Sequence, residues 1–381
     1  MLTTRGRWAI AFALATFVGA LLTGYPELFV LTAGLVAAMA VALLWVLRRP
    51  DLDIARQVKP DRARRHDVAL VQLEVRNEAR WPSPPSEVAE PCGRFETVHV
   101  RLPRLAFGRT ATFTYRLPTA ERAAYDIGPV ELSRADPFGL MRTAQRRGDA
   151  TRFWVHPTIH ALAGVAPGTA RSLEGPDRDH VPHGSVTFHA LREYVIGDDL
   201  RHVHWRSSAR LGELMVREHV DTSLPDTTLV VDTRRGAHLD AGFEEAMEAA
   251  GSIAVAILAA GYPLRMVTTC GRDVRGQSFG NHANQYLDAL SEVEPSDGDL
   301  DQVAQELVLG RRIDTLVAVT GTVSETDLAA LGALCRRARV SVLASVGTPD
   351  GTSVPAPRGS VVLQASTAVG FAGLWNQGVA R

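Results

Sequence analysis

Two long apolar runs near the N-terminus constrain this 381-residue chain more than any other feature. The first covers residues 8–22 and the second residues 28–47, and a helix that spans a bilayer needs about 20 such residues. The five residues between them, Thr-Gly-Tyr-Pro-Glu, favour a turn. The sequence therefore predicts a two-helix transmembrane hairpin over residues 1–50, with the remaining chain outside the bilayer.

Positive charges flank both ends of this predicted hairpin. Arg5 and Arg7 precede the first run, and Arg48 and Arg49 follow the second. The positive-inside rule then predicts a multi-pass protein of the inner (cytoplasmic) membrane, with the turn outside and the soluble domains in the cytoplasm. A cleaved signal peptide is the alternative, because it also begins with basic residues and a short apolar run. The second full-length run favours the hairpin.

Composition and cysteine usage agree with a cytoplasmic location. Hydrophobic residues make up 46% and charged residues 22% of the sequence, which is typical of a globular protein with some membrane-embedded part. A formal net charge of -1 gives no global field, so nonspecific nucleic-acid binding is not expected. Cys92, Cys270 and Cys335 are few, odd in number and far apart, which predicts free thiols in a reducing compartment. We expect all three to be small core residues.

Residues 51–160 have the pattern of an all-β domain. Polar and apolar residues alternate over 68–76, 96–102 and 110–117, and a further short run covers 130–133. Short strands separated by breaks that contain Pro and Gly predict an immunoglobulin-like sandwich. The segment Asp136-Pro137-Phe138-Gly139 fits a type I turn, which we interpret as structural.

From Asp226 onward, short apolar runs alternate with helical stretches. The runs have the character of buried parallel strands and cover residues 228–232, 264–269, 315–320, 340–346 and 361–363. The helical stretches cover residues 243–259, 284–292, 300–309, 327–337 and 367–377. Ser324 with Asp327 resembles a capping box at the start of one helix. The sequence predicts a doubly wound α/β domain over residues 226–381.

The run 191–218 is dense in charged and aromatic side chains. The residues that stand out as candidates for a signature or partner-docking site are Arg192, Glu193, Tyr194, Gly197, Asp198, Asp199, Arg201, Trp205, Arg206, Ser208, Arg210, Arg217 and Glu218. Met215, Val216 and the alternation over 202–205 indicate strands, while residues 197–199 and Gly212 indicate turns. So many charges cannot all be buried alone. Either the charged side chains pair with one another and stabilise the fold, which we call a structural clip, or some of them bind a partner.

The order of residues in this run resembles a known family. The residues that carry the resemblance are Leu191-Arg192-Glu193-Tyr194, Gly197-Asp198-Asp199, Arg201, Trp205, Ser208-Ala209-Arg210 and Glu213-Leu214 with Val216-Arg217-Glu218. Their order is similar to the signature of the bacterial domain-of-unknown-function family fifty-eight. Residues 125–130 and 136–140 look like its recurrent strand-and-turn segment. The resemblance implies a membrane-anchored companion of MoxR-type AAA+ ATPases, with no assigned biochemical activity. We take residues 161–225 as a signature linker segment.

The α/β domain resembles the von Willebrand factor A fold, which raises the question of a metal. An A-type domain with a working metal site carries an Asp-x-Ser-x-Ser loop after its first strand, whose oxygen ligands suit magnesium. Here the loop Asp232-Thr233-Arg234-Arg235-Gly236 lacks both serines and carries two arginines, and the later strand end at 319–322 lacks an acidic residue. We expect a degenerate metal site at Asp232 and Thr233, with Asp232 paired to an arginine and no metal or other cofactor bound.

Histidine and serine residues suggest two alternative activities, metal binding and nucleophilic catalysis. Seven of the twelve histidines lie between His156 and His204, and His202 and His204 would share one face of a strand. No acidic or thiol ligand lies at a recognised spacing from them, so we interpret them as structural or solvent-facing. Ser208 near His204 leaves a cryptic hydrolase open, although no Gly-x-Ser-x-Gly elbow is present. Without a Gly-x-x-x-x-Gly-Lys loop, nucleotide hydrolysis by this chain is not expected.

The sequence thus predicts a membrane-anchored cytosolic adaptor or scaffold that is not an enzyme. It would contact the lipid bilayer through its hairpin and act with a MoxR-type AAA+ ATPase in the assembly or maturation of protein complexes. Within the run 191–218 a structural clip and a docking surface both remain open. We expect Trp205 to be buried and Arg206 to lie nearer the partner. The alternatives are a cryptic hydrolase using Ser208 and His204, and a metal-dependent A-domain protein binder.

Overall fold

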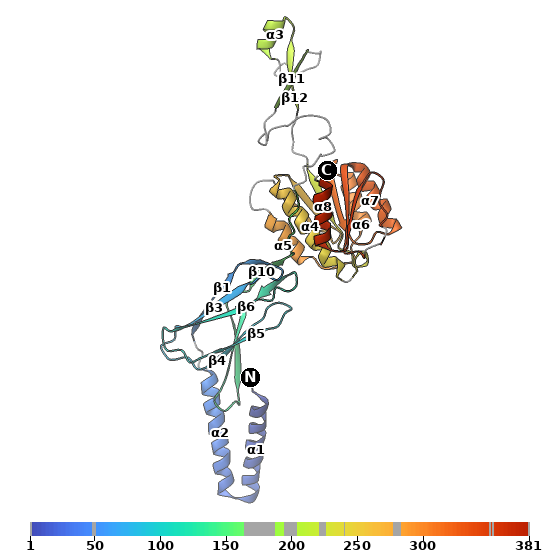
Figure 1. Ribbon diagram of the computed structural model, residues 1–381. Helices are drawn as coiled ribbons and strands as arrows, with labels where there is room; N and C mark the ends of the chain where they lie inside the picture. Colours follow the sequence, from blue (N-terminus) through green and yellow to red (C-terminus); the bar gives the residue numbers. More distant parts are fainter. Residues whose placement is uncertain are drawn as a thin grey trace. The chain divides into compact units, whose positions relative to one another are not determined.

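The computed structural model describes residues 2–47, 51–163, 187–193, 204–220, 226–239, 241–276, 283–349, 352 and 354–379 (Figure 1). The chain divides into two compact units, Met1–Pro157 and Thr158–Arg381. The first unit contains two apolar helices and a β domain. The second contains an α/β domain and a β-hairpin that carries a short helix.

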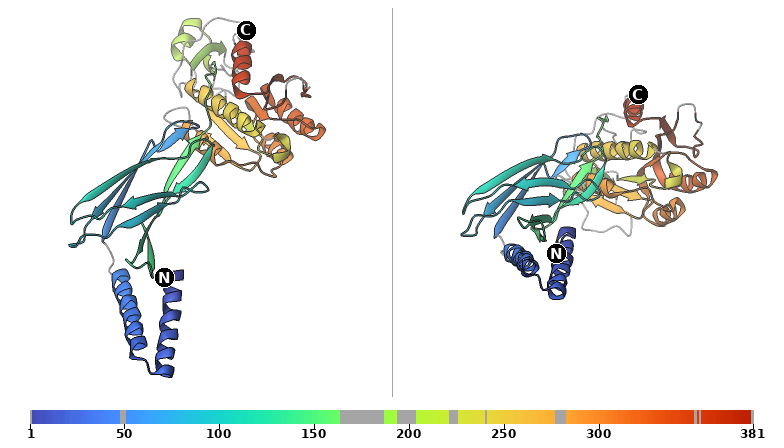
Figure 2. Two further views of the ribbon diagram at one scale, coloured as in Figure 1. Left: turned by 60° about the horizontal axis from the view of Figure 1, so that its bottom comes forward. Right: turned by 90° about the horizontal axis from the view of Figure 1, so that it is seen from below.

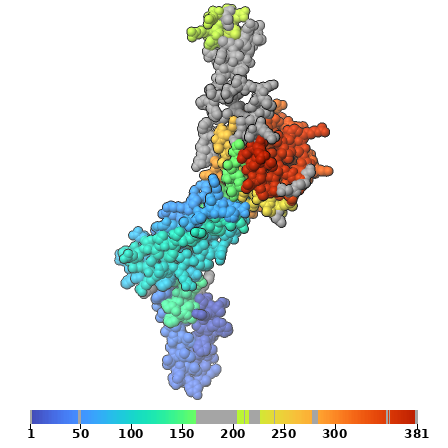
Figure 3. Space-filling model, viewed as in Figure 1, coloured from blue at the N-terminus to red at the C-terminus, as the bar shows by residue number. Residues whose placement is uncertain are grey.

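Two apolar helices open the first unit. Helices α1 (Thr4–Thr23) and α2 (Pro26–Leu47) coincide with the predicted apolar runs, and both are long and apolar enough to cross a membrane. Only 17% and 6% of their most apolar windows are buried, and their surface lies open on the face shown in Figure 3. The helices pack against each other as a hairpin, with Thr16 Oγ1 2.9 Å from Thr32 Oγ1.

The β domain of the first unit is built from short, mostly antiparallel strands (Figure 2). The strands are β1 (Leu52–Lys59), β2 (Arg62–Arg64), β3 (Leu70–Asn77), β4 (Ser86–Glu90), β5 (Val98–Leu102), β6 (Thr110–Arg116), β7 (Ala123–Ile127), β8 (Val130–Ala135), β9 (Arg142–Arg147) and β10 (Thr151–His156). They form sheets of order β1-β3-β6, β5-β4-β8-β9 and β2-β10-β7. Alternate residues of β3, including Val71, Leu73 and Val75, point into two adjoining apolar clusters. This arrangement confirms a β-sandwich-like domain.

The turn predicted at residues 136–139 is present between β8 and β9. The Gly139 amide donates to the Asp136 carbonyl at 3.0 Å, and the Phe138 amide donates to Asp136 Oδ1 at 2.8 Å. Gly139 has a φ of +67°, which glycine adopts readily. The Asp136 side chain is buried, so it holds this turn from inside.

The α/β domain has one largely parallel sheet with helices on both faces. Its strands are β13 (Thr227–Val231), β14 (Leu264–Thr268), β15 (Asp273–Gly276), β16 (Ile313–Thr320), β17 (Ala338–Val346) and β18 (Val361–Ala365), and its helices are α4 (Gly242–Ala259), α5 (Ala283–Glu292), α6 (Leu300–Leu309), α7 (Glu325–Arg337) and α8 (Ala368–Val379). The sheet order is β15-β14-β13-β16-β17-β18, and only the edge strand β15 pairs antiparallel. One apolar cluster joins the sheet to α4, α5 and α8, and a second joins it to α6 and α7. The predicted α/β architecture and the capping box of Ser324 and Asp327 are confirmed.

Residues 158–163, at the start of the second unit, contact the α/β domain through hydrogen bonds and apolar packing. His160 Nε2 lies 3.0 Å from Glu248 Oε2 on α4, and the Trp375 indole on α8 donates to the Ala163 carbonyl at 3.2 Å. Leu162 packs against the same apolar cluster as these helices. Residues 158–163 are therefore part of the α/β unit.

The cysteines correct one expectation. All three are free, Cys92 is buried and Cys335 is partly buried, but Cys270 is exposed. Cys270 lies in the turn between β14 and β15, where its side chain faces solvent. The prediction that every cysteine is a core residue is wrong for this position, because the chain turns here from β14 into the edge strand β15.

Candidate functional site

The signature run folds in its described part as a β-hairpin that carries a helix. Strands β11 (Thr187–Glu193) and β12 (Met215–Val220) pair antiparallel, and α3 (Trp205–Leu211) precedes β12. Arg192 pairs with Val216, and Leu191 with Arg217, so the two ends of the signature meet through their backbones. Glu193 and Glu218 belong to the same two strands. Five other signature residues lie outside the described residues, namely Tyr194, Gly197, Asp198, Asp199 and Arg201, and so does the metal-ligand candidate His202.

Ser208 fixes α3 to β12. Its hydroxyl donates to the His204 carbonyl at 3.2 Å and accepts from the Met215 amide at 2.8 Å. The side chain is buried, and the Gly212 amide closes the helix on the Ser208 carbonyl at 2.9 Å. Both hydrogen-bonding functions of the hydroxyl are thus used on the backbone. The His204 imidazole instead bonds Ser207, with Nδ1 2.7 Å from Oγ, so the structure does not pair His204 with Ser208 for nucleophilic attack.

Three large side chains of α3 are exposed. Trp205 is 66% exposed, and Arg206 and Arg210 are exposed on the same short helix. The expectation that Trp205 is buried is wrong, and so is its assignment to a strand, since it is the first residue of α3. The exposure of this side chain could not be predicted from the sequence, because a tryptophan is usually largely buried.

A second candidate site lies at the carboxyl end of β13, in the loop that begins with Asp232. Asp232 is 1% exposed, and its carboxylate receives Arg234 at two points, Nη2 to Oδ2 at 2.7 Å and Nε to Oδ1 at 2.9 Å. Thr320 Oγ1, at the end of β16, donates to Asp232 Oδ2 at 2.9 Å. The pairing of Asp232 with an arginine is the one predicted from the loop sequence.

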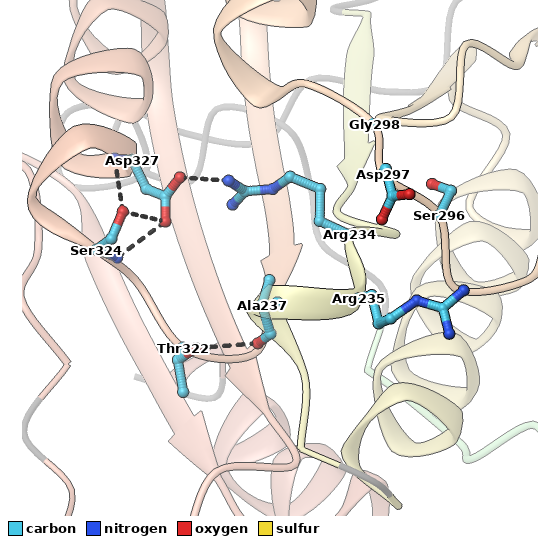
Figure 4. Close-up of a pocket in the computed structure, with 10 residues that line it drawn as sticks. Arg234, Arg235, Ala237, Ser296, Asp297, Gly298, Thr322, Ser324 and Asp327 are labelled. Carbon is cyan, nitrogen blue, oxygen red and sulfur yellow. Dashed lines mark hydrogen bonds and ion pairs between the residues drawn. The ribbon is translucent and has the colours of Figure 1, made fainter.

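Arg234 also reaches the start of α7. Its Nη1 donates to Asp327 Oδ1 at 2.6 Å, and Figure 4 shows the side chain extended toward Asp327 while the Arg235 side chain points the other way. Hydrogen bonding to Asp232 raises the pKa of Arg234 above its ordinary value, although burial opposes this. Burial would raise the pKa of Asp327, but hydrogen bonds from Arg234 and Ser324 outweigh it and lower that pKa. The guanidinium therefore stays charged between two carboxylates.

Thr233 takes part in a neighbouring hydroxyl cluster. Its Oγ1 lies 2.9 Å from Thr269 Oγ1 and 3.2 Å from Ser296 Oγ, and its amide donates to Thr269 Oγ1 at 2.8 Å. Beside this cluster is a cavity of about 430 Å³. Its lining residues are Arg234, Arg235, Gly236, Ala237, Ser296, Asp297, Gly298, Thr322, Ser324 and Asp327.

The chemistry of the Asp232 loop is that of a closed ion network. Arg234 supplies the positive charge that a bound cation would otherwise bring to Asp232 and Asp327, and its guanidinium contacts Asp232 at two points and Asp327 at one. Across the described residues, no group of three or more His, Cys, Asp or Glu side chains is placed to hold a metal ion. The sequence pattern identifies Asp327 only as a capping residue, because 93 positions separate it from Arg234.

Comparison with solved structures gives low likenesses. The CARDB domain of the PF1109 protein from Pyrococcus furiosus is 16% identical over 28% of this chain and 91% of its own, with a TM-score of 0.21. The putative ApaA protein from Bordetella pertussis is 13% identical over 28% of this chain and 94% of its own, with a TM-score of 0.19. A calcium-binding mutant of Bacteroides uniformis beta-glucuronidase 2 is 12% identical over 78% of this chain and 33% of its own, with a TM-score of 0.16. Scores this low carry no argument about fold or function.

Comparison with families is more informative than comparison with single proteins. No curated protein matches the chain significantly. Residues 190–367 match the family described as "Protein of unknown function DUF58", and this match includes the β-hairpin with α3 and most of the α/β domain. Over these residues, the chain is a member of the DUF58 family.

Proposed function

We propose that this protein is a membrane-anchored cytosolic adaptor that binds a protein partner through the exposed face of α3. The observation that carries the proposal is the exposure of Trp205, Arg206 and Arg210 on a helix that Ser208 fixes to β12. Tryptophan and arginine are the side chains most enriched at binding hot spots. An exposed tryptophan on a fixed helix is a preorganised contact.

The proposed partner is a MoxR-type AAA+ ATPase, and the proposed role is the assembly or maturation of a protein complex. This assignment rests on the family resemblance. The hydrogen bonds of Ser208 and His204 support binding more than hydrolysis, because both hydrogen-bonding functions of Ser208 are directed at backbone groups.

We infer that α1 and α2 span the inner membrane, with the domains that follow in the cytoplasm. Support comes from the length and apolar character of both helices and from the arginines at positions 5, 7, 48 and 49, which the positive-inside rule assigns to the cytoplasmic side. Free thiols agree with a reducing compartment.

We further infer that the α/β domain is related to the von Willebrand factor A fold and the β domain to immunoglobulin-like sandwiches. The support for the former is a doubly wound sheet whose first parallel strand, β13, is followed directly by Asp232. In this interpretation Arg234 occupies the position of a cation beside Asp232. Partner binding would then need no divalent metal.

A binding measurement with purified components tests the proposal. The full-length protein in nanodiscs is titrated with the purified MoxR-type ATPase of the same organism. We expect Trp205→Ala and Arg206→Ala each to weaken binding by about 30-fold, the effect of losing a hot spot worth about 2 kcal/mol. Leu309→Ala and Arg339→Ala are matched controls, since these side chains are exposed and belong to the α/β domain, not to α3. Unchanged affinity in both α3 variants would overturn the proposal.

A further inference from the structure

The turn between β8 and β9 contacts the ends of both apolar helices. At the start of α1, Thr3 Oγ1 donates to the Gly139 carbonyl at 2.7 Å, and the Thr3 amide donates to the Leu140 carbonyl at 3.0 Å. Gly6 fits here because a Cβ would lie 2.2 Å from the Leu140 carbonyl oxygen. This turn is therefore held directly against α1.

Arg134 makes the corresponding contact at the end of α2. Its Nη2 donates to the carbonyls of Trp45 at 3.0 Å and Val46 at 3.2 Å. A cation at the carboxyl end of a helix is favourable because it bonds the last carbonyls and offsets the helix dipole. Burial lowers the pKa of Arg134. The start of α1 and the end of α2 thus meet the same short segment, residues 134–141.

Helix length relates this segment to the bilayer. Helix α1 has 20 residues and α2 has 22, and at about 1.5 Å per residue they match a hydrocarbon core about 30 Å thick. If they span the membrane, their ends lie at its boundary. The headgroup layer beyond is only about 5 to 8 Å thick, so groups hydrogen-bonded to the helix ends lie within it.

Two further loops lie at this end of the β domain. Asp51 is four residues beyond the end of α2, a reach of at most about 14 Å, and its carbonyl accepts from the Glu78 amide at 2.9 Å. Asn77 Nδ2 then donates to the carbonyls of Trp81 and Leu105, each at 2.9 Å. The loops after β3 and β5 are thereby joined beside the point where the chain leaves α2.

Exposed aromatic side chains gather on these loops. Among the described residues of the β domain, the Phe, Tyr and Trp side chains that are more than half exposed are Trp81 at 80%, Phe107 at 64% and Phe138 at 53%. Each lies in one of the loops at this end. Arg80 precedes Trp81, and Arg104 and Arg109 flank Phe107, all three exposed. Aromatic rings beside arginines are typical of surfaces that lie in the headgroup layer.

We propose that Trp81, Phe107 and Phe138 form a membrane-contacting surface that lies in the headgroup layer of the bilayer in which α1 and α2 are anchored. The proposal rests on the inferred anchoring and adds a second contact with the same membrane. This surface would hold the β domain against the bilayer, so that the domain does not swing freely on the helices.

Fluorescence quenching in nanodiscs tests this surface. Single cysteines replace Trp81, Phe107 or Phe138 in a full-length Cys270→Ser/Cys335→Ser background, because Cys92 is buried, and each carries an environment-sensitive dye. Quenchers are placed in the lipid at headgroup depth, deep in the acyl chains, or in the water. The control for the sandwich is Val68→Cys, which is 60% exposed and lies beyond the opposite end of β3, ~24 Å along the strand. The control for the anchor is Val36→Cys in the middle of α2.

We expect the three loop dyes to lose fluorescence with the headgroup-depth quencher and little with the aqueous one. The dye at position 68 should show the reverse, and the dye at position 36 should respond to the deep quencher. Loop dyes quenched only from water, with position 36 still quenched by deep lipid, would overturn the surface and leave the anchor intact. Quenching of position 36 from water alone would overturn both.

Discussion

Arg234 and Asp232 form a two-point ion pair within a single loop, with Nη2 2.7 Å from Oδ2 and Nε 2.9 Å from Oδ1. The same guanidinium donates to Asp327 at 2.6 Å, so one arginine joins the ends of β13 and the start of α7. A buried carboxylate needs such a partner, because leaving it unpaired carries a large desolvation cost.

Replacing Arg234 should therefore destabilise the α/β domain. We expect Arg234→Ala to lower the free energy of unfolding by about 3 to 5 kcal/mol, since it leaves Asp232 buried without its charge partner. The measurement is thermal unfolding of the detergent-solubilised full-length protein. Arg235→Ala is the control, because Arg235 is exposed and, among the described residues, its side chain bonds only the backbone carbonyl of Pro295. Equal melting temperatures for Arg234→Ala and wild type would contradict this account of the loop.

Acid should weaken the same network. The folded-state pKa of Asp327 is lowered, so the stability that its charge provides is fully present above the unfolded pKa of about 3.9 and is lost as pH falls through the lower folded value. We expect the melting temperature of the wild type to fall below about pH 4, and Asp327→Asn to show a smaller fall from a lower starting point. If Asp327→Asn kept the full acid dependence, another carboxylate would be responsible.

How far the sequence predicts this architecture depends on the local pattern of each element. Apolar runs such as β13 and β16 are buried on both faces, which makes them visible without any tertiary information. By contrast, β9 reads Arg-Thr-Ala-Gln-Arg-Arg and has no apolar side, because it is an edge strand of its sheet. The start of α3 is hard to predict for a related reason, since a seven-residue helix is too short for its period to be recognised.

The candidate sites, too, could be predicted only where the interacting residues are close in the sequence. The loop sequence was enough to predict that Asp232 pairs with an arginine, because the two lie two positions apart. It could not show that Asp327 and Thr320 complete the network, because folding alone brings these residues to Asp232 and Arg234. The exposure of Trp205 could not be predicted from the sequence either, because burial depends on which residues folding brings around the side chain.

The β domain offers a test of a second buried ion pair. Arg56 Nε donates to Glu90 Oε1 at 2.5 Å, and a Cβ at Gly128 would lie 2.2 Å from Arg56 Nη2. Gly128→Ala should lower stability by more than the roughly 1 to 2 kcal/mol that its positive φ alone predicts. Gly148→Ala is the matched control, because Gly148 has a φ of +71° with open space around it. Equal melting temperatures in the two variants would show that Gly128 is not needed for the Arg56 pair.

Membrane orientation can be measured in cells. A reporter that is active only outside the cytoplasm should work when inserted at Tyr25, in the link between α1 and α2, and stay silent when fused to the C-terminus. An active C-terminal fusion would reverse the orientation. It would also place the free cysteines in an oxidising compartment.

Site-specific photocrosslinking from α3 tests the adaptor proposal most directly. A photoreactive amino acid replaces Trp205 in the full-length protein expressed in its host, and a second variant carries it at Leu309, which is 87% exposed at the end of α6. The account predicts an adduct with the MoxR-type ATPase from position 205 and none from position 309. An ATPase adduct from position 309 alone, or from neither position while the ATPase is present, would contradict docking through α3.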